Sequence, residues 1–138
     1  METKNRSGFK ELPHTADLAL KVWAPNLAEL LRQAAAGIHE LIGLRLVPGQ
    51  RIQKSIDLRA EDAEGLLVGF LNELLFWIEA DHIACDRFSL VLDGYHLTGF
   101  GECEQIGEIR KEIKAVTYHQ LKISSGENML ETTIVFDV

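Results

Sequence analysis

The chain has 138 residues, the usual size of one domain, and 46% of them are hydrophobic while 25% are charged, as in an ordinary globular protein. Its formal charge of -7, from 21 acidic and 14 basic residues, repels phosphate backbones and argues against direct binding to bulk nucleic acid. The sequence contains no apolar stretch of about 18 residues that could cross a bilayer, and no signal peptide. We therefore expect a cytoplasmic protein without a membrane partner, forming a single domain over residues 1–138, with residues 1–8 disordered.

The two cysteines, Cys85 and Cys103, form no CxxC pair and have no companion histidine at zinc-finger spacing. This pattern indicates neither a disulfide framework nor a zinc knuckle. We expect both cysteines to be buried and reduced.

The first predicted elements are two short strands, "FKELPH" and "LALKVWA". The second strand alternates Leu18, Leu20 and Val22 with residues of the other face, as a half-buried strand does. The two strands would form a hairpin around "HTAD", which runs from His14 to Asp17.

Two helices are predicted next. The first begins after the N-cap Asn26, keeps apolar residues at helical spacing and stops at Gly43. The second covers "AEGLLVGFLNELLFWIEAD", which has a wide apolar stripe. Gly65 and Gly69 each cost about 1 kcal/mol within a helix. They either admit a close neighbour or are tolerated near the helix start.

The other predicted elements are strands. "VPGQ" would turn the chain into the strand "RIQKSIDLR", and "RFSLVLDGYHLTGFGECEQ" would form a hairpin that turns at Asp93 and Gly94. After a loop at "QIGEIRKE", the strands "IKAVTYHQLKI" and "MLETTIVFDV" would be joined by "SSGEN". This order predicts an α+β fold, a two-layer single domain with two helices packed on a largely antiparallel sheet.

The last two strands can be aligned because their apolar residues must share the buried face. These apolar residues are Leu121, Ile123, Leu130, Ile134 and Phe136. The alignment sets Asp137 on the other face, opposite Val116, with Lys114 and Tyr118 as diagonal neighbours. We therefore predict that Lys114, Tyr118 and Asp137 converge. His119 would point inward, where a histidine is more often a core residue than a ligand.

Four motifs in this order, "HTAD", "LLVGFLNELLFW", "KAVTYHQLKI" and the terminal "FDV", resemble the archease family, small proteins that assist the RtcB-type RNA ligase in tRNA splicing. The resemblance runs from Leu12 to Val138. It implies an α+β domain that is not itself an enzyme. The sequence departs from the family pattern in helix two, where Phe76 and Trp77 stand in place of a common tyrosine.

The resemblance implies a divalent metal bound by Asp17 and Asp137, with calcium the first expectation and magnesium or manganese as alternatives. Such hard cations take about six to eight oxygen ligands, so backbone oxygens, water or the Val138 carboxylate would complete the shell. From the residues alone, an Asx turn accounts for Asp17 and a solvated terminus for Asp137. The resemblance favours the metal site for both.

Three further residues are candidates for function. His14 could bind the metal, carry a proton or anchor its loop through a hydrogen bond. Lys114 resembles the lysine of the family's functional strand, and could balance the aspartates or reach a nucleotide phosphate in a partner's pocket, but a plain surface lysine explains it equally. Glu73 could line the same area or simply face solvent.

The function implied by the resemblance is activation of the RtcB-type ligase, whose histidine is guanylylated from GTP. A chaperone or modulator of a tRNA-modifying methyltransferase is the alternative, and it would use an apolar surface patch and oligomerisation. A metal-dependent hydrolase would use Asp17 and Asp137 with His14 or His119 as base. The sequence contains no nucleophile elbow, P-loop or HExxH that would support this second alternative.

Overall fold

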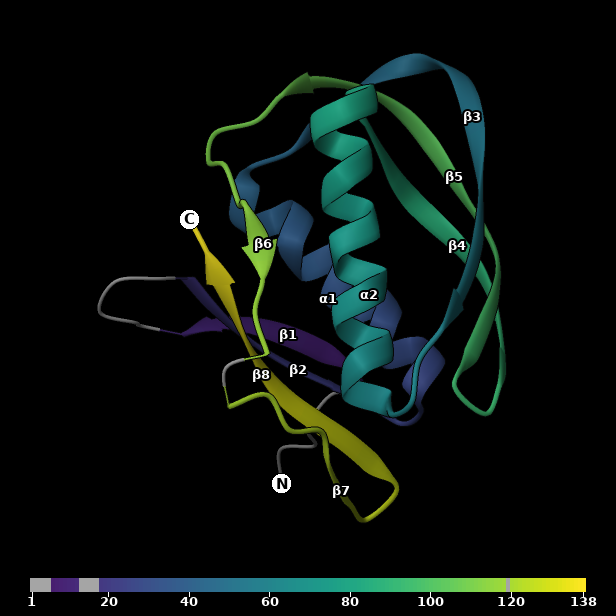
Figure 1. The fold of residues 1–138 in the computed structure, drawn as a ribbon. Helices are drawn as coiled ribbons and strands as arrows, with labels where there is room; N and C mark the ends of the chain where they lie inside the picture. The colour runs from purple at the N-terminus through teal and green to yellow at the C-terminus, as the bar shows by residue number, and fades with distance from the viewer. Residues whose placement is uncertain (1–5, 13–17, 119) are drawn as a thin grey trace.

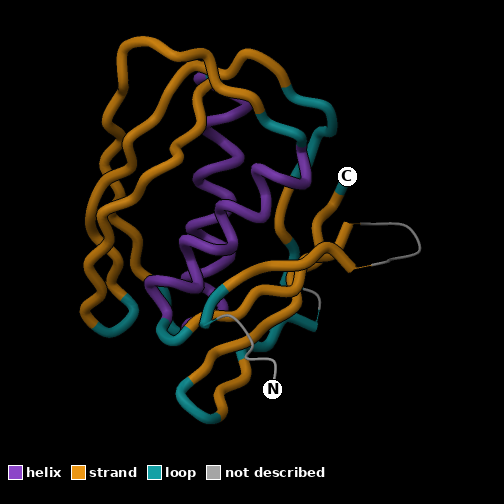
Figure 2. The backbone as a smooth tube through the Cα atoms, turned by 180° about the vertical axis from the view of Figure 1, so that it is seen from behind, coloured by secondary structure: helices purple, strands orange, loops and turns teal. Residues whose placement is uncertain are grey.

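A computed structural model of the protein describes residues 6–12, 18–118 and 120–138. In this part of the chain, helices α1 (Leu27–Ile42) and α2 (Ala63–Phe76) pack together between two antiparallel sheets, as the views from both sides show (Figures 1 and 2). The predicted α+β class is therefore confirmed. The strands divide between two sheets instead of forming one.

The first sheet has the strand order β1-β2-β8-β6, and β7 also pairs with β8. Its strands are β1 (Gly8–Leu12), β2 (Leu18–Ala24), β6 (Ala115–Val116), β7 (Ser124–Gly126) and β8 (Met129–Asp137). The second sheet has the order β3-β5-β4, with β3 (Arg45–Arg59), β4 (Ile83–Asp93) and β5 (His96–Glu108). Every pairing is antiparallel among the described strands.

Helix α1 begins and ends where the sequence predicts. The Oδ1 atom of Asn26 accepts a hydrogen bond from the Glu29 N–H at 2.9 Å, which satisfies one free donor of the first turn. Gly43 adopts the left-handed conformation at φ 63° and its N–H donates to Glu40 O, so it closes the helix without a Cβ clash. The predicted hairpin of the first two strands is also confirmed.

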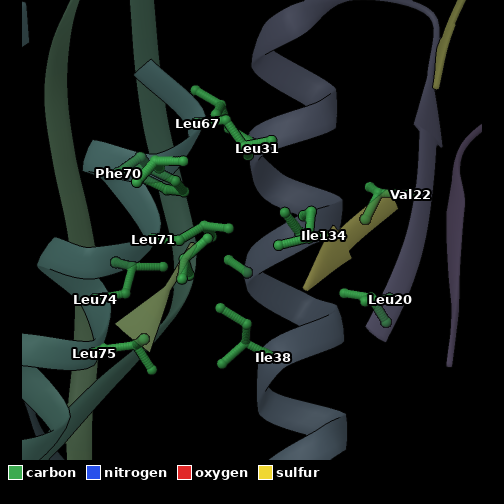
Figure 3. Packing of buried hydrophobic residues seen from close by; sticks show 14 of the residues in the cluster. Leu20, Val22, Leu31, Ile38, Leu67, Phe70, Leu71, Leu74, Leu75 and Ile134 are labelled. Carbon is green, nitrogen blue, oxygen red and sulfur yellow. The ribbon is translucent and has the colours of Figure 1, made fainter. Parts of the chain in front are cut away.

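Helix α2 is apolar on most of its circumference and lies at the centre of the core. Its side chains Leu67, Phe70, Leu71, Leu74 and Leu75 face Leu31 and Ile38 of α1, and Ile134 of β8 lies beyond (Figure 3). The helix gives way to a single π-helical turn, η1 (Trp77–Asp81), which the sequence does not predict. Lys54 fixes this turn, because its Nζ lies 5.6 Å from the Trp77 ring centroid and 3.2 Å from Asp81 Oδ2.

The two glycines of α2 have different surroundings. A Cβ on Gly65 would lie 2.9 Å from Asp62 Oδ1, the cap of the helix, whereas no described atom lies within 4 Å of a Cβ on Gly69. The close neighbour expected from the sequence is therefore present only at Gly65.

Replacing Gly69 by alanine is expected to raise the free energy of unfolding by about 0.5–1 kcal/mol, because alanine loses less backbone entropy in a helix and the site has room. Urea unfolding would measure the change. Gly65→Ala is the matched control and should bring no gain, because its Cβ would disturb the Asp62 cap. An unchanged or lower stability of Gly69→Ala would contradict the prediction.

Two predicted loops belong to strands. "VPGQ" does not end the strand, because β3 runs from Arg45 to Arg59, but the register shifts between Val47 and Ile52 and leaves residues 48–51 without a register partner on β5. Pro48 is tolerated there because β3 is an edge strand. β5 likewise continues to Glu108, so "QIGEIRKE" begins in a strand.

The cysteines are joined as a disulfide between β4 and β5, so the expectation of two reduced thiols is wrong. Phe88 pairs with Gly101 and Arg87 with Glu102, but a bulge at Asp86 shifts the register and sets Cys85 opposite Cys103. Without the bulge, Cys85 would face Glu104. A one-residue bulge leaves no clear sign in the sequence.

Gly8 is the first residue of β1 and its Cα lies close to the Trp23 ring, so the expected disorder of residues 1–8 does not extend to Gly8. Residues 1–5 lie outside the described residues. None of the helices in the described ranges is long and apolar enough to span a membrane.

Candidate functional site

The carboxyl end of β8 carries the candidate residues Asp137 and Val138. Phe136 is fully buried, so Asp137 projects from the other face of the sheet and is exposed, as predicted. The neighbouring strand β6 fixes the backbone there, since the Lys114 N–H donates to Asp137 O at 2.8 Å (Figure 1). Among the described residues, the Asp137 carboxylate forms no ion pair.

The register of the last strands differs from the prediction. Asp137 pairs with Ala115, and Val116 pairs with Phe136 and is buried at 5% exposure. The predicted alignment of Asp137 with Val116 is therefore wrong by one residue. It assumed one continuous strand from Ile113 to Ile123, whereas the paired strand β6 contains only Ala115 and Val116.

The chain leaves the sheet after β6. We call the described residues of the segment 114–118 and 120–123, which includes β6, the strap. The strap turns where the Leu121 N–H donates to Tyr118 O at 3.0 Å, with Gln120 at φ 53°. The exposed Tyr118 places its hydroxyl 3.8 Å from the position of a Cβ on Gly65, at the first turn of α2. Tyr118 therefore lies beside the first turn of α2. Lys114 meets Asp137 through the backbone, and its side chain forms no ion pair with the Asp137 carboxylate.

Helix α2 holds the strap with two polar side chains. Asn72 Oδ1 accepts a hydrogen bond from the Val116 N–H at 3.0 Å, and Glu64 Oε2 accepts one from the Ile123 N–H at 3.0 Å. The sequence shows these residues only as breaks in an apolar pattern, because their partners lie far along the chain. Glu73, the other polar candidate on this helix, is half-buried, and its carboxylate forms no hydrogen bond or ion pair with a described residue.

The "HTAD" candidates His14 and Asp17, and also His119, lie outside the described residues. The strand that follows "HTAD" is described. Leu18, the residue after Asp17 in the sequence, pairs with Phe136, the residue before Asp137. β2 and β8 thus place the residue that follows the first motif opposite the residue that precedes Asp137, on adjacent strands of one sheet.

The donor chemistry of this edge suits a hard cation. The exposed Asp137 side chain offers carboxylate oxygens, the ligands that calcium and magnesium prefer, and Val138 beside it is also exposed. Within residues 6–12, 18–118 and 120–138, no cluster of three or more His, Cys, Asp or Glu side chains could hold a metal. The described residues by themselves therefore form no complete metal site.

A separate cavity of about 620 Å³ lies between α1 and β4. Arg32 forms one wall, held by a hydrogen bond from its Nε to Phe88 O and by an ion pair with Glu29 at 2.7 Å. His39, Asp86 and Arg87 also line it. Cys85 also lines this cavity, but none of the candidate functional residues predicted from the sequence does.

His39 makes stability depend on pH. Burial lowers the pKa of His39 from 6.5 to about 4, and the charge of Asp86 opposes the shift only in part. As the pH falls below 6.5, the imidazole takes up a proton in the unfolded state but not in the folded state. The stability that His39 contributes is therefore fully present above pH 6.5 and is lost as the pH falls toward 4.

Replacing His39 by glutamine is expected to remove up to about 3 kcal/mol of this pH dependence. Urea unfolding of both proteins between pH 7 and pH 4 would measure it. The difference between the two profiles isolates His39 from the carboxyl groups that titrate in the same range. Parallel profiles would show that the imidazole does not contribute.

The fold and the site define a small α+β protein with a pair of antiparallel sheets around two helices and an exposed carboxylate edge at its carboxyl end. Comparison with known proteins gives the family. The model of the archease protein family matches residues 9–138, and the chain belongs to this family.

Curated relatives and solved structures agree with this assignment. The chain is 28% identical to protein archease of Methanothermobacter thermautotrophicus, over 95% of this chain and 99% of the relative. It is 31% identical to that of Saccharolobus islandicus strain Y.N.15.51, over 94% and 98%. The crystal structure of an archease from Thermotoga maritima, described as a possible chaperone, superposes with a TM-score of 0.73 at 29% identity, covering 94% of this chain and 96% of that one.

Proposed function

We propose that this protein is a metal-binding activator of an RtcB-type RNA ligase in tRNA splicing, with no turnover of its own. Membership of the archease family supports the proposal. The single structural observation that carries it is the pairing of Leu18 with Phe136, because this register draws the residues next to Asp17 and Asp137 together on adjacent strands.

In the proposed mechanism, Asp17, Asp137 and the Val138 carboxylate bind a divalent cation, with calcium expected first and magnesium or manganese as alternatives. The cation would supply positive charge against phosphate oxygens, which is the main requirement of phosphoryl-type transfer. Lys114, whose backbone is bonded to Asp137, would place a further positive charge beside the triphosphate. His14 would serve as a ligand or proton carrier at the same edge.

The net charge of -7 is consistent with recognition of a protein partner and not of RNA itself, because the field repels phosphate backbones. The ligase pocket would then provide the nucleotide and the reacting histidine, and this protein would provide positioned charge. No direct nucleic-acid contact is needed.

The deciding experiment is guanylylation of the cognate ligase from GTP, followed with and without this protein. Faster guanylylation supports the proposal, and an unchanged rate would overturn it. Incubating the purified protein alone with GTP and RNA tests the hydrolase alternative, which predicts turnover without the ligase.

A second candidate is a chaperone or modulator of a tRNA-modifying methyltransferase. The possible chaperone role given for the Thermotoga maritima protein favours it, as do the exposed aromatic side chains Phe76 and Tyr118 at 59% and 62% exposure. This function would persist after the aspartates are neutralised, whereas ligase activation would not.

A further inference from the structure

We infer that Asn72 of α2 is a positioning residue for the carboxylate edge at Asp137 and Val138, and that it acts through β6. The inference rests on the proposed function, in which these carboxylates bind a cation. Asn72 itself is not proposed to contact the carboxylates. It fixes the strand that fixes them.

β6 has a free edge that no other strand covers among the described residues. This strand is the last in its sheet, with β8 as its neighbour on one side only. The Lys114 N–H and the Thr117 N–H donate toward β8, to Asp137 O and Val135 O. The Val116 N–H is directed instead to α2, where Asn72 Oδ1 accepts it at 3.0 Å. Asn72 therefore replaces the missing strand partner at this edge.

β6 is too short to be held firmly in the sheet by its own backbone hydrogen bonds. It has two residues, far fewer than the usual strand, and it is followed by the turn at Tyr118 to Leu121. Its attachment depends on the few hydrogen bonds to β8, on burial of Val116, and on the bond to Asn72. A segment with so few contacts can detach locally while the rest of the domain stays folded.

The residue before β6 is hydrogen-bonded to Asp137, which carries one of the carboxylates. The bond from the Lys114 N–H to Asp137 O, at 2.8 Å, holds the last paired residue of β8. If the Val116 N–H loses its acceptor, a largely buried donor is left without a partner, which is costly, and release of β6 relieves the cost. Asp137 and Val138 then lose the neighbour that restricts their backbone. Binding of the cation must then order the backbone of Asp137 and Val138, and this entropic cost lowers the affinity for the cation.

Because outer partners of metal ligands typically change affinity by about 10- to 100-fold, Asn72→Leu is expected to weaken Ca²⁺ binding by at least about tenfold. Isothermal titration with Ca²⁺ alone measures this without the ligase. Amide hydrogen exchange of Lys114 and Val116 should accelerate in the same variant. Asn72→Asp keeps an oxygen acceptor in the same place and should restore slow exchange.

Asn26→Ala is the matched control, because Asn26 also accepts one backbone N–H through its amide oxygen, at the start of α1. It should lower stability by a comparable amount and leave Ca²⁺ affinity unchanged. If Asn72→Leu does not fold, Asn72→Gln, which moves the acceptor outward by one methylene, takes its place with the same expectations.

A folded Asn72→Leu or Asn72→Gln protein with wild-type Ca²⁺ affinity and wild-type exchange at Lys114 would overturn the inference. Wild-type protein that binds none of Ca²⁺, Mg²⁺ and Mn²⁺ would instead overturn the metal part of the proposed function. In that case the exchange of Lys114 and Val116 still decides whether Asn72 holds β6.

Discussion

Asp137→Ala is expected to abolish stimulation of ligase guanylylation while leaving the fold intact. The side chain is exposed and forms no ion pair with the described residues, so its removal should change stability by less than about 0.5 kcal/mol. Among the described residues, its carboxylate is the one proposed side-chain ligand of the cation. Loss of a charged ligand from a hard-cation site removes much of its affinity.

The measurement pairs guanylylation kinetics with urea unfolding of the same preparation. Asp17→Asn should behave in the same way if both aspartates bind one cation. Asp93→Asn removes an equal charge from the turn between β4 and β5, on the other sheet, and should stimulate normally. Normal stimulation by folded Asp137→Ala would exclude this carboxylate from the site.

Much of the fold could be predicted because its patterns are local. Helix α1 is predicted by the helical spacing of its apolar residues and by the residues at its two ends, Asn26 as N-cap and Gly43 in the left-handed conformation. The hairpin of β4 and β5 follows from alternation and from the turn at Gly94, which has φ 58°. In each case the residues that determine the element lie within it.

The errors occur where distant residues decide the structure. The parity of the last strands assumed that β6 would continue, but Asn72 and Glu64 of α2 draw the chain away from the sheet after Val116. The disulfide between Cys85 and Cys103 likewise depends on the bulge at Asp86. Neither contact has a periodic signature, because each involves a single residue and a partner far along the chain.

The candidate site shows the same division. The exposure of Asp137 follows from alternation with the buried Phe136 and was predictable. Its true neighbours were not, because they depend on the length of β6. The pairing of Leu18 with Phe136 joins the strand that follows the first motif to the strand that ends in the last one, and a sequence reveals such a pairing only through resemblance to a family.

Extending the chain beyond Val138 is expected to weaken calcium or manganese binding and reduce stimulation of guanylylation. An added residue converts the terminal carboxylate to a peptide carbonyl and so removes one negative charge and one oxygen from the proposed shell. It also places new atoms next to Asp137, where β8 ends. We expect an affinity loss of about tenfold, smaller than the loss caused by Asp137→Ala, because the side-chain carboxylate is retained.

An equal tag at the amino terminus is the control for bulk, since it is attached ahead of β1 (Gly8–Leu12), and it should bind and stimulate as the untagged protein does. Calorimetry with Ca²⁺ and Mn²⁺ gives the affinities, and the guanylylation assay gives the activity. If the two tagged proteins match in both measurements, the Val138 carboxylate is not a ligand, and cation binding at this edge depends on the Asp137 side chain with Asp17.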